Sequence, residues 1–212
     1  GPRRRHGQRG WLLTCDEVRS LRVPRGGGHP LYGETPDLAT MGKISGGGLP
    51  VAAFGGRADV MDLLDPRRSP NLAQGGTYNG NPLGMAAGVA AMKELTPDVY
   101  EDLNRKGARV KDQLSEIFAS HGVAAQVNGV ASLLAIHFTA TPVTDYRSKA
   151  TADEGMTRDF FLGLVNHGVL MAPRAMGALS TPMGEAEIQR FVDAVDAVVV
   201  EHLPPWHAAI PD

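Results

Sequence analysis

A lysine followed by a glycine-rich turn is the first feature of this sequence that could carry out chemistry. Lys43 stands after Gly42, and residues 46–48 are all glycine. A nucleotide-binding P-loop would need its first glycine at position 37, which is Asp37, so that class of site is excluded. A lysine amine shielded from water loses its proton more readily and then acts as a nucleophile that forms Schiff bases. Lys43 is therefore a candidate catalytic residue, and a solvated loop lysine is the alternative.

Two acidic residues after a short apolar run form the second candidate. Residues 11–15 (WLLTC) predict a buried strand, and Asp16 and Glu17 stand at its carboxyl end. In open α/β sheets, ligands bind at this end of the strands. A bare buried carboxylate would cost several kcal/mol, so it must be paired or hydrogen-bonded. Asp16 is thus a candidate binding residue. The alternatives are an ion pair with Arg19 or Arg22 and a cap on the next turn.

A glycine- and asparagine-rich loop that leads into an apolar helix is the third candidate. It covers residues 74–82 (QGGTYNGNP) and contains Gly76 and Thr77. Its backbone N–H groups, a hydroxyl group and the positive end of the helix could bind an anion. A turn with a helix cap and no ligand is the alternative.

The elements that must position these residues follow from the hydrophobic pattern. Residues 37–41 and 51–54 predict two short strands, each followed by glycine. Asn81 and Pro82 predict the start of a helix that is almost wholly apolar to position 92 and therefore buried. An amphipathic helix is expected from Pro97 to Gly122. The remaining pattern predicts strands at 123–127, 132–138 and 169–172, and helices at 153–167 and 185–203.

The composition of the 212-residue chain excludes several classes of protein. With 21 Lys and Arg against 23 Asp and Glu, the net charge is -2, which argues against a nucleic-acid binder. The basic start (residues 3–6 and Arg9) lacks interleaved aromatic residues, so a solvated tail is favoured over a nucleic-acid arm. No apolar run approaches the roughly 18 residues that span a bilayer. The single cysteine, Cys15, allows no internal disulfide and no cysteine-based metal site, which is typical of the cytoplasm.

Three segments in a fixed order resemble the class III aminotransferases among the fold-type I pyridoxal phosphate (PLP) enzymes. Within that family, the sequence of these segments is most similar to those of the glutamate-1-semialdehyde 2,1-aminomutases and their close relatives. The similarity runs from about residue 10 to the end. The segments are 12–18 (LLTCDEV), 35–43 (TPDLATMGK) and 75–88 (GGTYNGNPLGMAAG), joined by 179–183 (LSTPM) before the last helix.

The resemblance implies roles for matching positions. Lys43 matches the lysine that binds the PLP cofactor covalently and then moves a proton between substrate carbons. Asp16 matches the carboxylate that pairs with the pyridine nitrogen and makes the ring an electron sink. Val18 matches the apolar residue packed against that ring. Gly76 and Thr77 match the contact to the phosphate of the neighbouring subunit's cofactor, so a homodimer with shared active sites is expected. No metal ion is expected in the site.

The resemblance also implies the architecture. Residues 1–96 are expected to be the C-terminal part of an α/β PLP-binding large domain, and residues 97–212 a small α+β C-terminal domain. Only 15 residues precede Asp16, whereas the family has its phosphate-binding turn and its ring-stacking aromatic residue before this aspartate. Because the chain also begins with Gly and not Met, we expect a fragment, a processed product or a trimmed chain.

The expected function is that of a PLP-dependent aminomutase or aminotransferase of the kind that converts glutamate 1-semialdehyde to 5-aminolevulinate. Its substrate would be a small amino acid or amino aldehyde. One alternative is a non-catalytic remnant or interaction module that has lost the PLP chemistry. Another is an anion-binding α/β protein without a Schiff base, which would leave the pairing of Asp16 with Lys43 unexplained.

Overall fold

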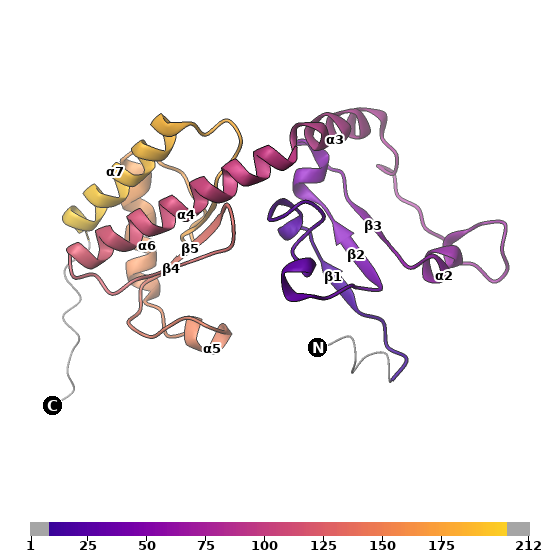
Figure 1. Ribbon diagram of the computed structural model, residues 1–212, viewed down its shortest axis with the longest axis horizontal. Coiled ribbons are helices and arrows are strands. Elements are labelled where there is room, and N and C mark those ends of the chain that lie inside the picture. Colours follow the sequence, from indigo (N-terminus) through magenta and orange to yellow (C-terminus); the bar gives the residue numbers. More distant parts are fainter. Residues whose placement is uncertain (1–8, 203–212) are drawn as a thin grey trace. The chain divides into compact units, whose positions relative to one another are not determined.

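The computed structural model describes residues 9–202, which form two compact units, one up to Tyr100 and one from Glu101 onward (Figure 1). The basic residues at positions 3–6 lie outside the described residues. Arg9 is described, and its Cζ atom lies 5.1 Å from the centroid of the Trp11 ring. The predicted roles of residues 1–96 and 97–212 as large-domain and small-domain parts stay a prediction.

The first unit is built on a three-stranded sheet in the order β1-β2-β3. Strand β1 (Thr14–Asp16) runs parallel to β2 (Leu38–Met41), and β2 runs antiparallel to β3 (Ala53–Gly56). The strands predicted near 37–41 and 51–54 are therefore confirmed, with the second shifted by two residues. The parallel pair matters most for function, because it brings two carboxyl ends of strands to the same edge.

One buried carboxylate ties the three strands together at the amino end of β2. Asp37 is 8% exposed; its Oδ2 accepts a hydrogen bond from the Leu13 N–H at 2.7 Å, and its Oδ1 lies 2.9 Å from Nη1 of Arg57. Leu13 precedes β1 and Arg57 follows β3, so a single side chain holds both neighbours of β2 in place.

Short helical turns and one longer helix complete the first unit. The longer helix is α3 (Pro82–Glu94), whose start is capped as predicted, since Oδ1 of Asn81 accepts from the Gly84 N–H at 3.1 Å. The short elements are η1 (Ser20–Arg22), η2 (His29–Tyr32), η3 (Lys43–Gly46), α2 (Ala58–Met61) and η4 (Asp62–Leu64).

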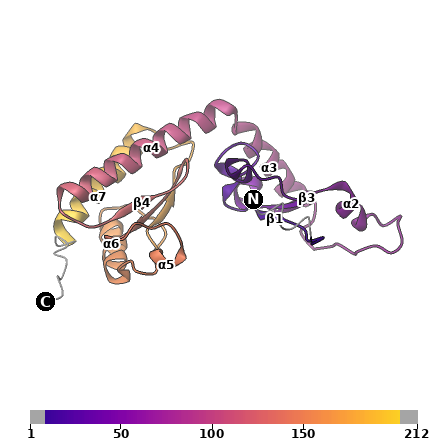
Figure 2. The same cartoon turned by 60° about the horizontal axis from the view of Figure 1, so that its bottom comes forward.

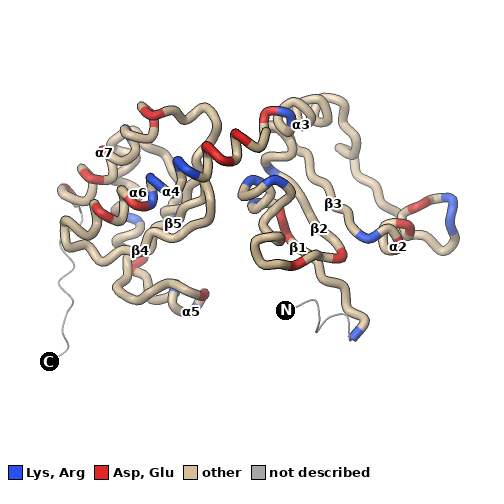
Figure 3. Tube along the Cα trace, in the orientation of Figure 1, with Lys and Arg blue, Asp and Glu red and all other residues tan. Residues whose placement is uncertain are grey.

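Two predictions of burial in this unit are wrong. Trp11 and Leu12 are 55% and 47% exposed, and in α3 Leu83 and Val89 are 70% and 55% exposed. Only Gly84 and Gly88 of α3 are buried. Charged residues of this helix occur only at its end, at positions 93 and 94 (Figure 3). The apolar pattern was correct, but this unit supplies neighbours to only one side of α3.

The second unit packs three helices with an antiparallel sheet (Figures 1 and 2). Its core contains Phe118, Phe138 and Phe160, which are almost fully buried and whose ring centroids lie 5.3–6.1 Å apart. The helices are α4 (Pro97–Ser120), which belongs to this unit from Glu101 onward, α6 (Glu154–Asn166) and α7 (Glu185–His202), with a short α5 (Tyr146–Lys149). The strands are β4 (Gln126–Asn128), β5 (Leu133–His137) and β6 (Met176–Ala178).

Most of the predicted elements of this unit are confirmed; the strand predicted at 123–127 begins three residues later, at Gln126, and one predicted strand is wrong. Asp153 caps α6 by accepting from the Met156 N–H at 2.9 Å, and Gly168 takes the left-handed conformation (φ 73°) just after it. The strand predicted at 169–172 is wrong, because only a single bridge from Ala172 to Met176 forms there. Pro173 cannot donate a backbone hydrogen bond, and the strand β6 forms after it.

Candidate functional site

The register of the parallel strands places Asp16 and Lys43 at one edge of the sheet. Asp16 is the last residue of β1 and lies opposite Thr40 of β2, and Lys43 follows Thr40 by three residues. With strands about 4.8 Å apart and a rise of about 3.3 Å per residue, the two Cα atoms lie within about 11 Å of each other. A carboxylate and an amine are thus held at the ends of two hydrogen-bonded neighbours.

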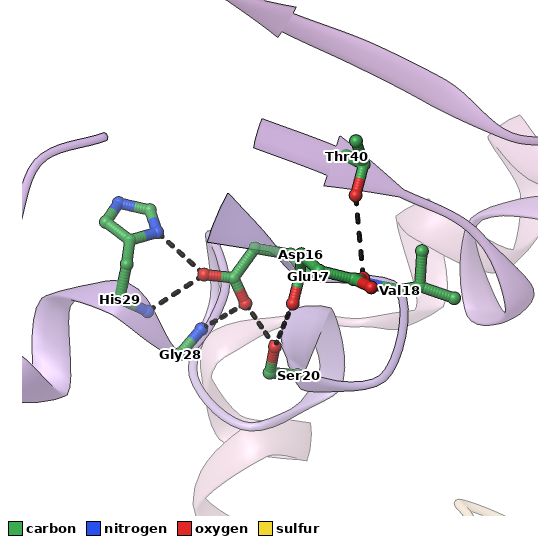
Figure 4. Close-up of polar contacts among 7 residues, drawn as sticks. All are labelled: Asp16, Glu17, Val18, Ser20, Gly28, His29 and Thr40. Carbon is green, nitrogen blue, oxygen red and sulfur yellow. Dashed lines mark hydrogen bonds and ion pairs between the residues drawn. The ribbon is translucent and has the colours of Figure 1, made fainter. Parts of the chain in front are cut away.

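The side chain of Asp16 is oriented by local contacts (Figure 4). Its Oδ1 accepts from the Val18 N–H at 2.9 Å and from Oγ1 of Thr40 at 3.5 Å. The first bond closes a turn within the chain, which is the capping role given above as an alternative. Asp16 is exposed, so the predicted burial of this residue is wrong; the carboxylate is nevertheless held in a defined orientation at the strand end.

Lys43 begins the turn η3 in an unusual backbone conformation. Its φ is 53°, in the left-handed region that costs a non-glycine residue about 1–2 kcal/mol. Such conformations persist where the surrounding structure imposes them, and they cluster at functional sites. Lys43 is exposed, so the expected shielding of its amine from water is not present in this chain.

Helix α3 packs tightly behind the lysine turn. A Cβ atom added to Gly88 would lie 2.5 Å from the carbonyl oxygen of Ser45, and one added to Gly47 would lie 2.5 Å from that of Ala87. Because Cβ atoms essentially never come so close to a carbonyl oxygen, glycine is required at both positions. The small residues of α3 therefore fix the backbone that carries Lys43.

Val18 lies beside the same turn. A Cβ atom added to Gly42 would be 3.5 Å from Cγ1 of Val18, which is an ordinary van der Waals contact. The valine side chain therefore lies next to the residue that precedes Lys43. The structure brings together Asp16, Val18 and Lys43, three of the five predicted site residues.

Gly76 and Thr77 do not belong to the two strand ends that carry Asp16 and Lys43. Both are exposed in the loop between η4 and α3, where the carbonyl of Gly76 accepts from the Asn79 N–H at 3.0 Å. The strand register that brings Asp16 and Lys43 together does not include this loop. Their predicted contact to a phosphate in a neighbouring subunit stays a prediction.

Glu17 is a polar residue of this site to which the sequence analysis gave no role. It is 3% exposed, and its carboxylate accepts from the N–H groups of Gly28 (2.6 Å) and His29 (2.9 Å), and from Oγ of Ser20. His29 Nδ1 lies 2.9 Å from Oε1. Burial alone would raise the pKa of Glu17, but these hydrogen bonds outweigh it and lower the pKa to about 2. The available signal was the run of three glycines at 26–28, which predicts a tight turn with free N–H groups.

Residues 9–202 contain neither a cluster of metal-binding side chains nor a helix that could span a membrane. No group of three or more His, Cys, Asp or Glu side chains there could hold a metal ion. No helix in the same range has the length and apolar character needed to cross a membrane.

The comparison with protein families decides the assignment. The family model described as Aminotransferase class-III matches residues 6–183. The chain belongs to the class-III aminotransferases. In this aminotransferase chain the fold is also shared with solved structures: an omega-transaminase from Sphaerobacter thermophilus superposes with a TM-score of 0.90 at 40% identity, over 94% of this chain and 46% of that one.

Two further relatives extend the comparison of this class-III aminotransferase chain. A glutamate-1-semialdehyde 2,1-aminomutase from Desulfotalea psychrophila is 42% identical over 187 residues, which are 86% of this chain and 43% of the relative. A solved transaminase with PLP bound has a TM-score of 0.87 at 29% identity, over 95% of this chain and 46% of that one. The chain therefore spans less than half the length of the relatives that it matches.

Proposed function

We propose that this chain is the C-terminal part of a PLP-dependent aminomutase or aminotransferase that acts on a small amino acid or amino aldehyde. The observation that carries the proposal is the placement of Asp16 and Lys43 at the carboxyl ends of two parallel, hydrogen-bonded strands. The aminomutase relative supports the conversion of glutamate 1-semialdehyde to 5-aminolevulinate as the reaction of the whole protein, and the transaminase relatives support amino transfer.

The residues at this edge of the sheet fit PLP. Asp16 offers a carboxylate for the pyridine nitrogen, Lys43 an amine for the aldehyde, and Val18 an apolar side chain for the face of the ring. When bound, PLP supplies an electron sink that stabilises negative charge on the substrate carbon. Asp16 would hold the ring nitrogen in its protonated form. The Nζ atom of Lys43 would accept a proton from one substrate carbon and donate it to another, which requires this atom to lie close to both carbons.

We further propose that two copies of the whole protein share their active sites. Gly76 and Thr77 lie on an exposed loop of the first unit, outside the two strand ends that carry Asp16 and Lys43. A backbone N–H and a hydroxyl so placed suit the phosphate group of a cofactor bound to a second copy. The apolar side chains exposed along α3 are in keeping with a larger assembly.

A non-catalytic role is the second candidate, and a specific observation favours it. Asp16 and Lys43 are both exposed, whereas a site that excludes water strengthens every charge interaction in it. On this hypothesis the chain keeps the fold of the family and acts as an interaction module.

Reductive trapping tests the two hypotheses. The protein is mixed with PLP, its visible absorbance is recorded, and borohydride reduction followed by peptide mapping locates the modified lysine. We expect the label on Lys43, and about tenfold less label in Lys43→Ala, because the amine is the nucleophile. Lys93→Ala, which removes another exposed lysine of the same unit, is the control and should label like the wild type. Label scattered over surface lysines in the wild type would support the non-catalytic role instead.

A further inference from the structure

Glu17 and Asp16 are adjacent acidic residues with opposite environments. Asp16 is exposed at the strand end, whereas Glu17 is 3% exposed and turned inward (Figure 4). Because strand residues alternate between the two faces of a sheet, the two carboxylates point to different sides. Glu17 therefore has no direct access to a ligand that Asp16 holds, and a role for it must be indirect.

The carboxylate of Glu17 accepts hydrogen bonds from Ser20 and from a loop 11 and 12 residues further along the chain. Oε2 accepts from the Gly28 N–H at 2.6 Å and from Ser20 Oγ, and Oε1 accepts from the His29 N–H at 2.9 Å with His29 Nδ1 at 2.9 Å. Hydrogen bonds from several donors offset the cost of burying this charge. The side chain thus ties residues 28–29 to the end of β1.

The backbone of Glu17 is fixed as well. Its N–H donates to the carbonyl of Thr40 at 2.9 Å, which continues the parallel ladder by one residue, and its carbonyl accepts from the Leu21 N–H at 3.0 Å. All the polar groups of Glu17 are therefore bonded to three separate segments. Its neighbours Asp16 and Val18 take their positions from this fixed point.

Gly27 makes room for the carboxylate. Its φ is 106°, and a Cβ atom there would lie 2.5 Å from Cδ of Glu17. A side chain at position 27 would therefore push the carboxylate away from its donors. The glycine run and the buried acid are two independent parts of one arrangement.

We propose that Glu17 is a positioning residue that fastens the loop at residues 27–29 to the end of β1 and so sets Asp16 and Val18 against the cofactor ring. The proposal rests on the proposed function for the identity of the ring. The fixing of Asp16 and Val18 by Glu17 can be tested without any cofactor.

The cofactor-free test is amide hydrogen exchange on the full chain. The Val18 N–H is bonded to Oδ1 of Asp16, so its protection reports whether that turn is intact. In Glu17→Gln we expect the protection of Val18 and Gly28 to fall by about tenfold or more while that of β2 stays unchanged, because the local turn opens before the sheet does. Glu34→Gln is the control, because it removes another acidic side chain of the first unit that is not bonded to Glu17. Unchanged protection of Val18 in Glu17→Gln would overturn the proposal.

The second variant reaches the same arrangement from the other side. Gly27→Ala should reproduce the loss of Val18 protection, because its methyl group displaces the carboxylate. If Glu17→Gln does not fold, Gly27→Ala decides the outcome. A Gly27→Ala protein with wild-type protection at Val18 would contradict the proposal.

The PLP-loaded protein gives a readout that general destabilisation would not move. We expect Lys43 still to be labelled in Glu17→Gln, but the pH at which the visible absorbance changes should shift by about one unit, because Asp16 is no longer held at the ring nitrogen. An unchanged pH profile in both variants would refute the positioning of Asp16 against the ring. If the wild type itself gives no Lys43 label, the proposed function fails, and hydrogen exchange alone decides the role of Glu17.

Discussion

At the scale of single residues, Glu17 couples the stability of the first unit to pH. Its pKa is about 2 in the folded chain against an ordinary value of 4.5, because hydrogen bonds to the charged form outweigh burial. A lowered pKa means that the folded state binds its proton less readily than the unfolded chain does. The stabilisation is therefore complete above the unfolded pKa and is lost as the pH falls through the folded pKa.

We expect an acid-dependent difference between the wild type and Glu17→Gln. Between about pH 6 and about pH 3, the free energy of unfolding of the wild type should fall by about 2 kcal/mol more than that of the variant, which cannot titrate at this position. Urea unfolding at the two pH values, followed by a probe in the first unit, measures this difference. Parallel pH curves for the two proteins would show that Glu17 is not the group responsible.

Asp16 should affect chemistry more than cofactor binding. In a preparation of the whole protein that turns over substrate, we expect Asp16→Asn to lower kcat by at least about a hundredfold while PLP occupancy changes little, because the charge matters most when negative charge develops on the substrate. Steady-state kinetics and the absorbance of bound PLP give the two values. An equal loss of both would contradict the role given to Asp16.

The sequence predicted these residues unevenly. Asp16 and Lys43 were candidates because a strand end and a glycine-rich turn are local signals, whereas Val18 was named only through the resemblance to the class III aminotransferases. The role of Glu17 was missed because its donors at positions 28 and 29 return to it only through the folded loop. The exposure of Asp16 and Lys43 was not predictable either, since burial depends on what packs over the sheet edge and not on the residues themselves.

At the scale of elements, α3 packs tightly against η3, the turn whose first residue is Lys43. We expect Gly88→Ala to destabilise the first unit by about 1–2 kcal/mol, because overpacking against the Ser45 carbonyl outweighs the gain in helix propensity. It should also slow the labelling of Lys43 by PLP. Chemical unfolding and labelling kinetics check the two effects.

Gly55→Ala is the matched control for this prediction. A Cβ atom at position 55 would meet nothing within 4 Å, and no left-handed φ is required there. Its free energy of unfolding should stay within about 0.5 kcal/mol of the wild type. Equal destabilisation by both substitutions would show that the α3 contact has no special role.

Element boundaries were predicted best where capping chemistry is strong. Asn81 caps its helix as expected, and Asp153 and Gly168 bound the helix that was expected at 153–167, because caps act on groups only two to four residues away. The strand predicted at 169–172 failed because an apolar run cannot show whether a pairing partner is in reach. The burial of α3 failed for the same reason: its apolar residues are exposed in this chain.

At the scale of the whole molecule, the two units differ in the size of their cores. Among the described residues, only four of the buried hydrophobic side chains belong to the first unit, namely Leu21, Val23, Leu95 and Tyr100. The second unit has the phenylalanine cluster and the apolar faces of three helices. Since burial of apolar surface is the main source of stability, the second unit should be the more stable one.

Hydrogen exchange should resolve this difference within one molecule. We expect the amides of β5 and α7 to exchange at least about a hundredfold more slowly than those of β1 and β3, because the latter open with the weaker unit. Adding PLP should slow exchange at β1 and β2 if the cofactor binds there. Equal protection across both units would show that the difference in core size does not make the second unit more stable.

The pairing of Thr40 with Asp16 means that the number of residues between Thr40 and Lys43 sets how far the lysine lies from Asp16. Inserting or deleting one residue in β2 would carry the amine about 3.3 Å along the sheet and would exchange the strand's inner and outer faces. Substitutions at Ala39 leave this spacing unchanged. Over evolutionary time, the residues of this segment should therefore change in identity while its length stays constant. An engineered insertion should displace the reactive lysine even when every amino acid of the site is still present.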